Sequence, residues 1–270
     1  QPVEFGRSEF ADVILRPAQW GAYFQDKMEF DNFIVNAGLR VDFFDSKANV
    51  LVDQLKLSRP ATLAPADPEY QVSPRFGLAF PITEEGVLHL SYGHFFQTPQ
   101  YNLMFLNPAY NLNATEAFQV GNPGLRSERT VSYEFGLQQQ LSSDIGLDVT
   151  IYYKDVRNLL GTQIFDIGNG NKYSQYVNQD YGNTRGFIVS FEKRFSNNFS
   201  ANLDYTFQIA KGNASDPNSV FLDNQTDPPR ESEKQLAPLD WDRRQSLNVS
   251  VTVGEVSDYT ITMAGRLGSG

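Results

Sequence analysis

The two histidines are the side chains best suited to acid–base or nucleophilic chemistry, yet neither stands in a pattern that performs it. His89 and His94 are the only histidines among 270 residues. A catalytic role for either histidine would need a nucleophile held beside it, and no nucleophile motif or metal-ligand spacing accompanies either residue. Cysteine is absent, which excludes disulfides and thiolate metal ligands. The sequence therefore predicts a protein that is not an enzyme, with no catalytic residue, no metal site and no cofactor.

Five ionisable residues stand between apolar neighbours inside alternating runs of sequence. Because alternate residues of a β-strand point to opposite faces, this spacing puts all five on the polar face of a sheet: Arg40, Arg75, His89, Glu134 and Asp204. One interpretation is that they face the path of a transported ligand. The other, which we favour for most of them, is pairing between strands in a hydrated interior, worth about 0.2–1 kcal/mol for each pair.

The segment 97–129 is a long connection that is rich in aromatic side chains. Aromatic faces combined with directed polar groups are typical of ligand pockets. We therefore expect ligand contacts from five residues of this segment: Tyr101, Asn102, Phe105, Tyr110 and Phe118. The same apolar residues could instead pack against neighbouring loops, and the sequence leaves both alternatives open.

The elements that carry these candidates show apolar–polar alternation with a period of two, repeated about ten times along the chain. The runs 33–43 and 199–209 alternate most regularly. Most runs have about 9–13 residues, near the roughly 9–11 of a tilted membrane-spanning strand and above the ~5–6 of strands in soluble sheets. No run of eighteen apolar residues is present, which excludes a transmembrane helix.

Short and long connections alternate along the predicted strands. Short turns are expected at 31–32, 83–86, 142–144, 196–198 and 254–257, and long loops at about 46–71, 97–129, 156–183 and 211–244. Outer-membrane barrels have this asymmetry, with tight periplasmic turns, long extracellular loops and aromatic girdles. Aromatic residues are 13% of this chain and flank both ends of the predicted strands. A soluble sheet would leave the loop asymmetry unexplained. The net charge of -10, with no basic stripe to offset it, disfavours nucleic acid as a partner, and none is expected.

Several short segments, in this order, resemble the barrel portion of TonB-dependent receptors. They are Gln25-Asp26-Lys27, Gly38-Leu39-Arg40-Val41-Asp42, Ser73-Pro74-Arg75-Phe76-Gly77, Tyr92-Gly93-His94-Phe95-Phe96-Gln97-Thr98-Pro99, Asn122-Pro123-Gly124-Leu125-Arg126-Ser127-Glu128-Arg129 with Tyr133-Glu134-Phe135-Gly136, and Leu239-Asp240-Trp241-Asp242-Arg243-Arg244-Gln245. The fifth is similar to the family's NP-x-L-x-P-E…YE-x-G segment, although Ser127 stands where the family usually has proline.

The resemblance implies an all-β fold, a transmembrane antiparallel up-and-down β-barrel. Family barrels have 22 strands, so residues 1–270 are expected to form about ten strands of a single barrel domain, truncated at both ends. No plug domain or TonB-contacting peptide is recognisable in these residues.

The implied function is a receptor in the outer membrane of a Gram-negative bacterium that takes up a nutrient with energy from TonB. The implied partners are outer-membrane lipid, the plug domain, the TonB complex and an extracellular ligand. The resemblance leaves open whether that ligand is a siderophore or other small molecule, a saccharide or a peptide. The alternative is a passive pore or a structural or adhesin barrel. A hydrolase embedded in a barrel is disfavoured because no catalytic triad is recognisable.

Overall fold

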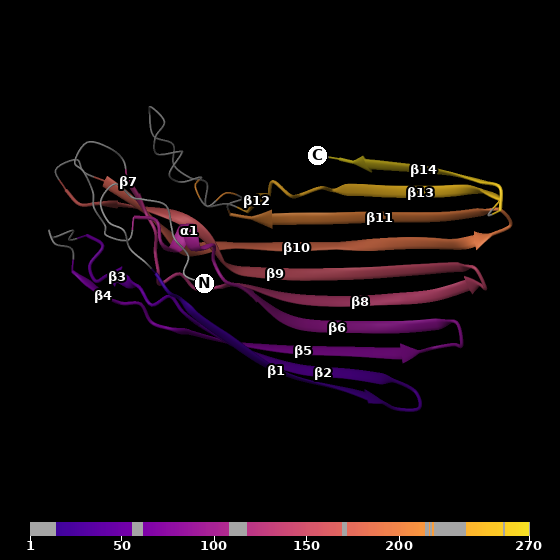
Figure 1. Cartoon of the computed structure of the whole chain (residues 1–270), viewed down its shortest axis with the longest axis horizontal. Helices are drawn as coiled ribbons and strands as arrows, with labels where there is room; N and C mark the ends of the chain where they lie inside the picture. Colours follow the sequence, from indigo (N-terminus) through magenta and orange to yellow (C-terminus); the bar gives the residue numbers. More distant parts are fainter. Residues whose placement is uncertain are drawn as a thin grey trace.

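The computed structural model describes residues 15–55, 62–107, 118–168, 172–213, 216, 218, 236–255 and 257–269. Ten long strands form one antiparallel sheet (Figure 1). They are β1 (Ala18–Glu29), β2 (Ile34–Asp45), β5 (Glu69–Pro81), β6 (Gly86–Gln97), β8 (Glu128–Ser142), β9 (Ile145–Asp166), β10 (Lys172–Ser196), β11 (Phe199–Gly212), β13 (Gln245–Glu255) and β14 (Tyr259–Gly268).

Each long strand pairs with the long strands that precede and follow it in the sequence. Among the described residues, β1 and β14 have a long neighbour on one side only. The sheet is therefore an open part of an up-and-down barrel, and the fold class predicted from the alternation is confirmed.

Short elements lie at the loop end of the sheet. β3 (Asn49–Leu51) pairs with β4 (Leu63–Pro65), β7 (Phe118–Val120) runs parallel to β10, and β12 (Ala237–Pro238) pairs with β11. The four-residue helix α1 (Tyr101–Met104) follows β6. No helix within the described ranges is long and apolar enough to cross a membrane.

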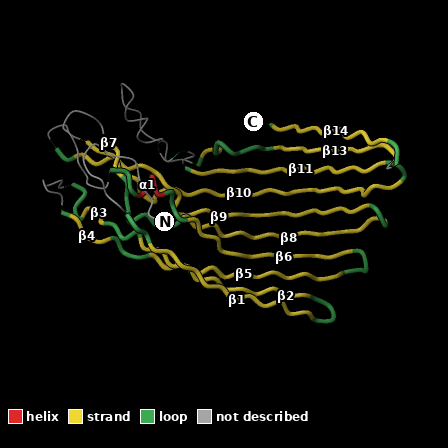
Figure 2. The backbone as a smooth tube through the Cα atoms, viewed as in Figure 1, coloured by secondary structure: helices red, strands yellow, loops and turns green. Residues whose placement is uncertain are grey.

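The five predicted short turns all join adjacent strands at one end of the sheet (Figure 2). Longer connections at the opposite end join β2 to β5, β6 to β8, and β11 to β13. This arrangement confirms the asymmetry expected from the sequence for three of the four long loops.

The fourth predicted loop, 156–183, is wrong. β9 continues to Asp166 and β10 begins at Lys172, so most of this segment is a paired hairpin. Backbone pairing runs from the Lys172–Asp166 pair to the Lys193–Ile145 pair, with a bulge around Asp180. Neighbouring residues 173–176 are all buried. Both faces of the hairpin are covered there, and the apolar–polar alternation that marks the other strands is absent.

The register separates the sheet into two faces, which we call the apolar face, carrying Phe135, and the polar face, carrying Glu134. One row across the apolar face consists of Leu90, Phe135, Ile151, Phe187 and Phe207. The parallel row on the polar face consists of Ser91, Glu134, Tyr152, Gly186 and Gln208. The side chains of Phe135 and Ile151 are 47% and 53% exposed. A contiguous exposed surface of this kind requires an apolar surrounding.

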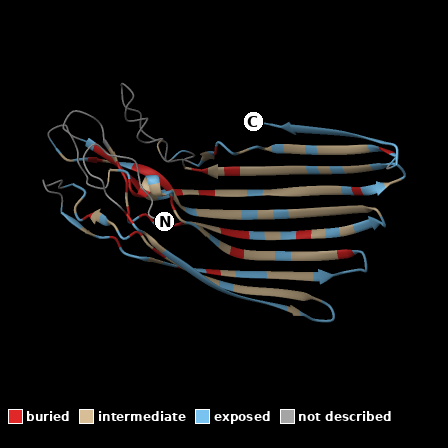
Figure 3. Cartoon of the chain, viewed as in Figure 1, coloured by how far each residue is buried: buried red, intermediate tan, exposed pale blue. Residues whose placement is uncertain are grey.

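Aromatic pairs lie at both ends of the apolar face. Near a short turn, Phe30 and Phe33 stack with ring centroids 4.5 Å apart. Near the loop end, Trp20 stacks on Phe43 at 5.6 Å. Rings at these two levels correspond to the interfacial girdles of membrane barrels. Fully buried residues are concentrated at the loop end, in the extensions of β9 and β10 and in the segments beside them (Figure 3).

Two adjacent short turns are joined through Asp144. Its carboxylate accepts hydrogen bonds from the hydroxyls of Ser196 and Ser142 and from the ammonium group of Lys193, the last at 2.9 Å. The side chain of Lys193 is 9% exposed and its nitrogen lies 4.3 Å from the ring centroid of Phe199. These bonds, with Ser196 foremost and then Lys193, hold the pKa of Asp144 well below its ordinary value of 3.8.

The assignment of faces predicts opposite outcomes for two neighbouring substitutions in β11. Leu203→Arg places a charge on the apolar face, between Phe191 and Val249, and should cost about 2–4 kcal/mol of folding free energy in a membrane. Asn202→Arg lies on the polar face and should be tolerated. The measurement is barrel yield and heat-modifiable gel mobility of the full-length protein. Equal tolerance of both variants would refute the facing.

The Asp144 contact predicts an acid-dependent contribution to stability. A carboxylate whose folded pKa is lowered stabilises the fold above its ordinary pKa and loses that contribution as the pH falls toward the folded pKa. Asp144→Asn should therefore unfold at lower denaturant concentration than wild type at pH 7, with the difference shrinking below about pH 4. Exposed Asp258, in the β13–β14 turn, provides the control Asp258→Asn. A difference that is constant from pH 7 to pH 3 would exclude this role.

Candidate functional site

A shallow groove of about 300 Å³ lies on the polar face and is lined by residues of β1, β2, β5, β6 and β8. The guanidinium carbon of Arg75 lies 4.9 Å from the ring centroid of Phe95. Glu134 accepts hydrogen bonds from the hydroxyls of Ser91 and Ser132, at 3.3 and 3.2 Å. Neither Arg75 nor Glu134 forms an ion pair within the described residues. The groove thus presents a cation and a carboxylate that are both positioned and available.

Glycines on the polar face let side chains from both flanking strands meet. The Nε2 atom of His89 lies 3.3 Å from Oγ1 of Thr150, and a Cβ atom at Gly136, between them, would lie 2.6 Å from that hydroxyl oxygen. One strand pair further, Tyr152 donates a hydrogen bond to Gln208 at 3.2 Å across Gly186. His89 is therefore held by its neighbours, although its Nδ1 atom has no partner among the described residues.

The other two predicted polar residues lie outside this groove. Arg40 donates two hydrogen bonds to the carboxylate of Asp42, at 2.8 and 2.6 Å, on the same strand face. Asp204 lines a second groove of about 370 Å³ together with Asn248 and Arg266. The structure thus brings Arg75 and Glu134 together and leaves Arg40, His89 and Asp204 apart from them.

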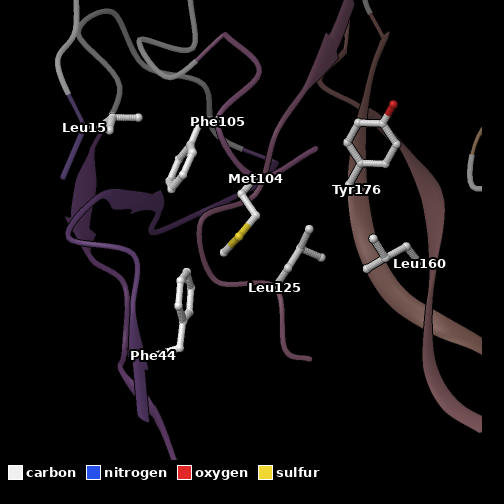
Figure 4. Packing of buried hydrophobic residues seen from close by; sticks show 7 residues of the cluster. All are labelled: Leu15, Phe44, Met104, Phe105, Leu125, Leu160 and Tyr176. Carbon is white, nitrogen blue, oxygen red and sulfur yellow. The ribbon is translucent and has the colours of Figure 1, made fainter. Parts of the chain in front are cut away.

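The aromatic segment after β6 folds onto the neighbouring strands (Figure 4). Its buried core consists of Leu15, Phe44, Met104, Phe105, Leu125, Leu160 and Tyr176. Met104 is fully buried, and Phe105 is 3% exposed. The ring of Tyr101 lies between those of Phe44 and Phe105, at centroid distances of 6.2 and 5.7 Å.

These contacts place the predicted ligand-binding residues in different environments. Phe105 is a packing residue here, Tyr101 is half-buried and Asn102 is exposed. Tyr110 lies outside the described residues, and only the backbone of Phe118, in β7, is described. Of the two alternatives for this segment, packing is observed for Tyr101, Leu103, Met104 and Phe105. Ligand binding by Tyr101, Asn102, Phe105, Tyr110 and Phe118 stays a prediction.

Within the described ranges, no three His, Asp or Glu side chains lie close enough to hold a metal ion. The groups on both surfaces offer hydrogen bonds, charge and aromatic rings, which are the interactions used in ligand recognition.

The family profile described as "TonB dependent receptor-like, beta-barrel" matches residues 7–264. The chain belongs to the TonB-dependent receptor family. A comparison with curated protein sequences gave no match.

Solved structures of similar fold include one transporter and two receptors. The FrpB iron transporter of Neisseria meningitidis is 14% identical, with a TM-score of 0.63 over 94% of this chain and 33% of that one. A mutant of the ferric enterobactin receptor PfeA of Pseudomonas aeruginosa is 16% identical, with a TM-score of 0.63 over 92% and 32%. The alcaligin outer-membrane receptor FauA of Bordetella pertussis is 18% identical, with a TM-score of 0.57 over 95% and 38%. The chain spans about a third of the length of these proteins.

One segment that resembles a TonB-dependent receptor motif, 122–128, is hydrogen-bonded to β5, β9 and β10 at the loop end. The side chain of Asn158, in β9, donates to the Ser127 carbonyl at 3.3 Å. The side chain of Asn122 donates to the Tyr176 carbonyl at 3.0 Å. Asn178 exchanges two hydrogen bonds of 2.8 Å with the backbone of Arg126. Ser127, fully buried, donates from its backbone N–H and its hydroxyl to the carboxylate of Glu69, and its hydroxyl accepts from Gln71.

These contacts show what serine contributes at position 127, where the family usually has proline. Proline, the usual residue there, has neither an N–H nor a hydroxyl group, so it could not make the bonds that join this segment to Glu69 and Gln71. Sequence reasoning missed these contacts and those of Asn158 and Asn178. One local feature marks these residues: the backbone of Asn158 is left-handed, with φ 61°. This conformation is visible in the folded chain but cannot be read from the sequence.

The packing of this segment predicts different effects for two residues only two positions apart. Met104→Ala should cost about 2–5 kcal/mol because it opens a cavity in a closed core, and it should make the 97–129 connection sensitive to protease. Asn102→Ala, at an exposed position, should leave that sensitivity unchanged. The measurement is limited proteolysis of the full-length protein in detergent. Equal cleavage of both variants would mean that the segment is not packed as described.

Proposed function

We propose that this chain is part of the wall of an outer-membrane receptor that takes up a metal chelate with energy from TonB. The main observation that supports this proposal is the match of residues 7–264 to the TonB-dependent receptor barrel. The two faces of the sheet support the membrane location, because one face is apolar and exposed while the other carries the polar grooves.

The open edges of the sheet support a longer barrel in which further strands pair with β1 and β14. Unpaired backbone groups of an edge strand cost several kcal/mol each in hydrocarbon. A closed barrel removes that cost, and the solved relatives, about three times as long, have room for the additional strands. The plug domain and the contact with TonB belong to this proposal and lie outside the strands described here.

The choice of a metal chelate as substrate rests on the names of the structural relatives. FrpB is an iron transporter, PfeA is a ferric enterobactin receptor and OprC is a copper transporter. Two surfaces of this chain are suited to such a ligand: the exposed Asn102 beside Tyr101 at the loop end, and the groove with Arg75 and Glu134. A cation stacked on an aromatic ring is suited to anionic chelator oxygens.

The function is tested by uptake in porin-deficient cells that produce the full-length protein, with and without TonB. Radiolabelled ferric catecholate, ferric hydroxamate and copper chelates are compared with a labelled oligosaccharide and a labelled peptide. We expect one metal chelate to accumulate, and only in cells that contain TonB, because an energised receptor needs that coupling.

Accumulation independent of TonB would instead favour a passive pore. TonB-dependent accumulation of the oligosaccharide or the peptide would support the receptor function but with a different substrate class.

Arg75→Gln is compared with the matched variant Arg194→Gln, at the short-turn end of β10. Only Arg75→Gln should reduce uptake of the chelate.

A further inference from the structure

The apolar face has one region of unusual composition, close to the loop end. Arg129 in β8 pairs directly with Arg157 in β9, four residues beyond the Tyr133–Tyr153 pair of the same face. Tyr153 in turn pairs with Arg185 in β10. We call Arg129, Arg157 and Arg185 the arginine cluster. Three adjacent strands thus direct guanidinium groups away from the polar face.

The position of the arginine cluster along the strands corresponds to the edge of a bilayer. Arg157 follows Ile145, the first residue of β9, by twelve positions. At about 3.3 Å for each residue and a strand tilt of about 40°, the two residues are separated by about 30 Å along the membrane normal. The apolar band of such barrels is about 25 Å tall. Arg129 and Arg157 therefore lie just beyond it, and the long side chain of Arg185 can extend to the same level.

The charges of the arginine cluster are incompletely compensated. Arg157 donates to Asp155 at 2.9 Å, stacks over Tyr181 at 5.5 Å and keeps a side chain that is 53% exposed. Arg129 and Arg185 have no ion pair among the residues that the structure describes, and the Nε–H of Arg129 has no hydrogen-bond acceptor there. Three arginines and one aspartate give a net charge of +2 in a chain of net charge -10.

The direct pairing of Arg129 with Arg157 is unfavourable without an additional anion. Like charges opposite each other on adjacent strands destabilise a sheet. A phosphate group between the two guanidinium groups would reverse the sign of that interaction, since arginine binds phosphate through charge-assisted, often bidentate hydrogen bonds.

The surface beside the arginine cluster indicates what carries the phosphate. The Val131–Asp155 pair separates the paired arginines from Tyr133 and Tyr153, which are 49% and 41% exposed and lie on the membrane side. Phe135 and Ile151 continue this apolar surface. An anionic headgroup above and acyl chains below would contact both regions at once. An acidic peptide would use only the charged part.

We infer that the arginine cluster binds the phosphate groups of an anionic glycolipid in the outer leaflet, with its acyl chains packed on the adjoining apolar strip. The inference rests on the membrane location in the proposed function and adds a lipid site on the outside of the wall. It involves neither of the polar-face grooves.

The test uses the full-length protein inserted in phosphatidylcholine nanodiscs that contain either diphosphoryl lipid A or the same lipid with both phosphates removed. Native mass spectrometry measures lipid binding. We expect wild type to bind the phosphorylated lipid more tightly. Each arginine-to-glutamine change should weaken that binding about fivefold, the factor that one basic residue contributes near an anionic surface. The double variant R129Q/R157Q should lose about 25-fold.

Controls separate charge from folding. R129K/R157K keeps both charges and should retain most of the affinity, whereas Arg194→Gln, at the opposite end of the chain's wall and on the polar face, should retain all of it. Heat-modifiable mobility verifies that every variant is folded. Equal binding of the two lipids, or equal affinity of R129Q/R157Q and wild type, would overturn the inference while leaving the proposed uptake intact. Failure of wild type to insert into nanodiscs would overturn both.

Discussion

The requirement that every backbone N–H and C=O group of the wall has a partner is the constraint on which the rest of this structure depends. A surface that faces hydrocarbon offers no water to an unpaired peptide group, and the long strands of this wall pair with their sequence neighbours. These ladders fix the register, and the register in turn decides which face each side chain occupies. The two polar grooves, the aromatic rings near both ends and the arginine cluster all follow from it.

The sequence predicts this fold wherever one face of a strand is apolar and the other polar. The runs 33–43 and 199–209 alternate regularly because they lie in β2 and β11, between a polar and an apolar environment. The hairpin formed by residues 156–183 escaped prediction for the corresponding reason. Residues 160–162 and 173–176 are buried without alternation, since other segments pack on both sides of them. Apolar–polar alternation arises only where the two faces of a strand meet different environments. Both faces of this hairpin are buried, so the alternation is absent.

For the candidate site, the sequence predicts which face a residue occupies but not which residues lie close together. Alternation places Arg75 and Glu134 on one face, but their proximity depends on the pairing order of β5, β6 and β8. At the loop end, composition identifies an aromatic segment without distinguishing a binding surface from a small core. Phe105 and Asn102 are three positions apart, yet one is buried by Phe44 and Tyr101 and the other is exposed. That difference comes from long-range contacts that no local pattern contains.

Two glycines of the polar face bring together side chains that are far apart in the sequence. Because Gly136 has no side chain, His89 and Thr150 occupy its space from opposite sides, and Tyr152 and Gln208 do the same above Gly186. A methyl group at either glycine would displace both neighbours, and a smaller neighbour would leave a gap that only a larger central residue could fill. At Gly136 and Gly186, a change of the central residue is therefore tied to the side chains on both flanking strands. Each of these two positions acts as a set of three residues drawn from three consecutive strands.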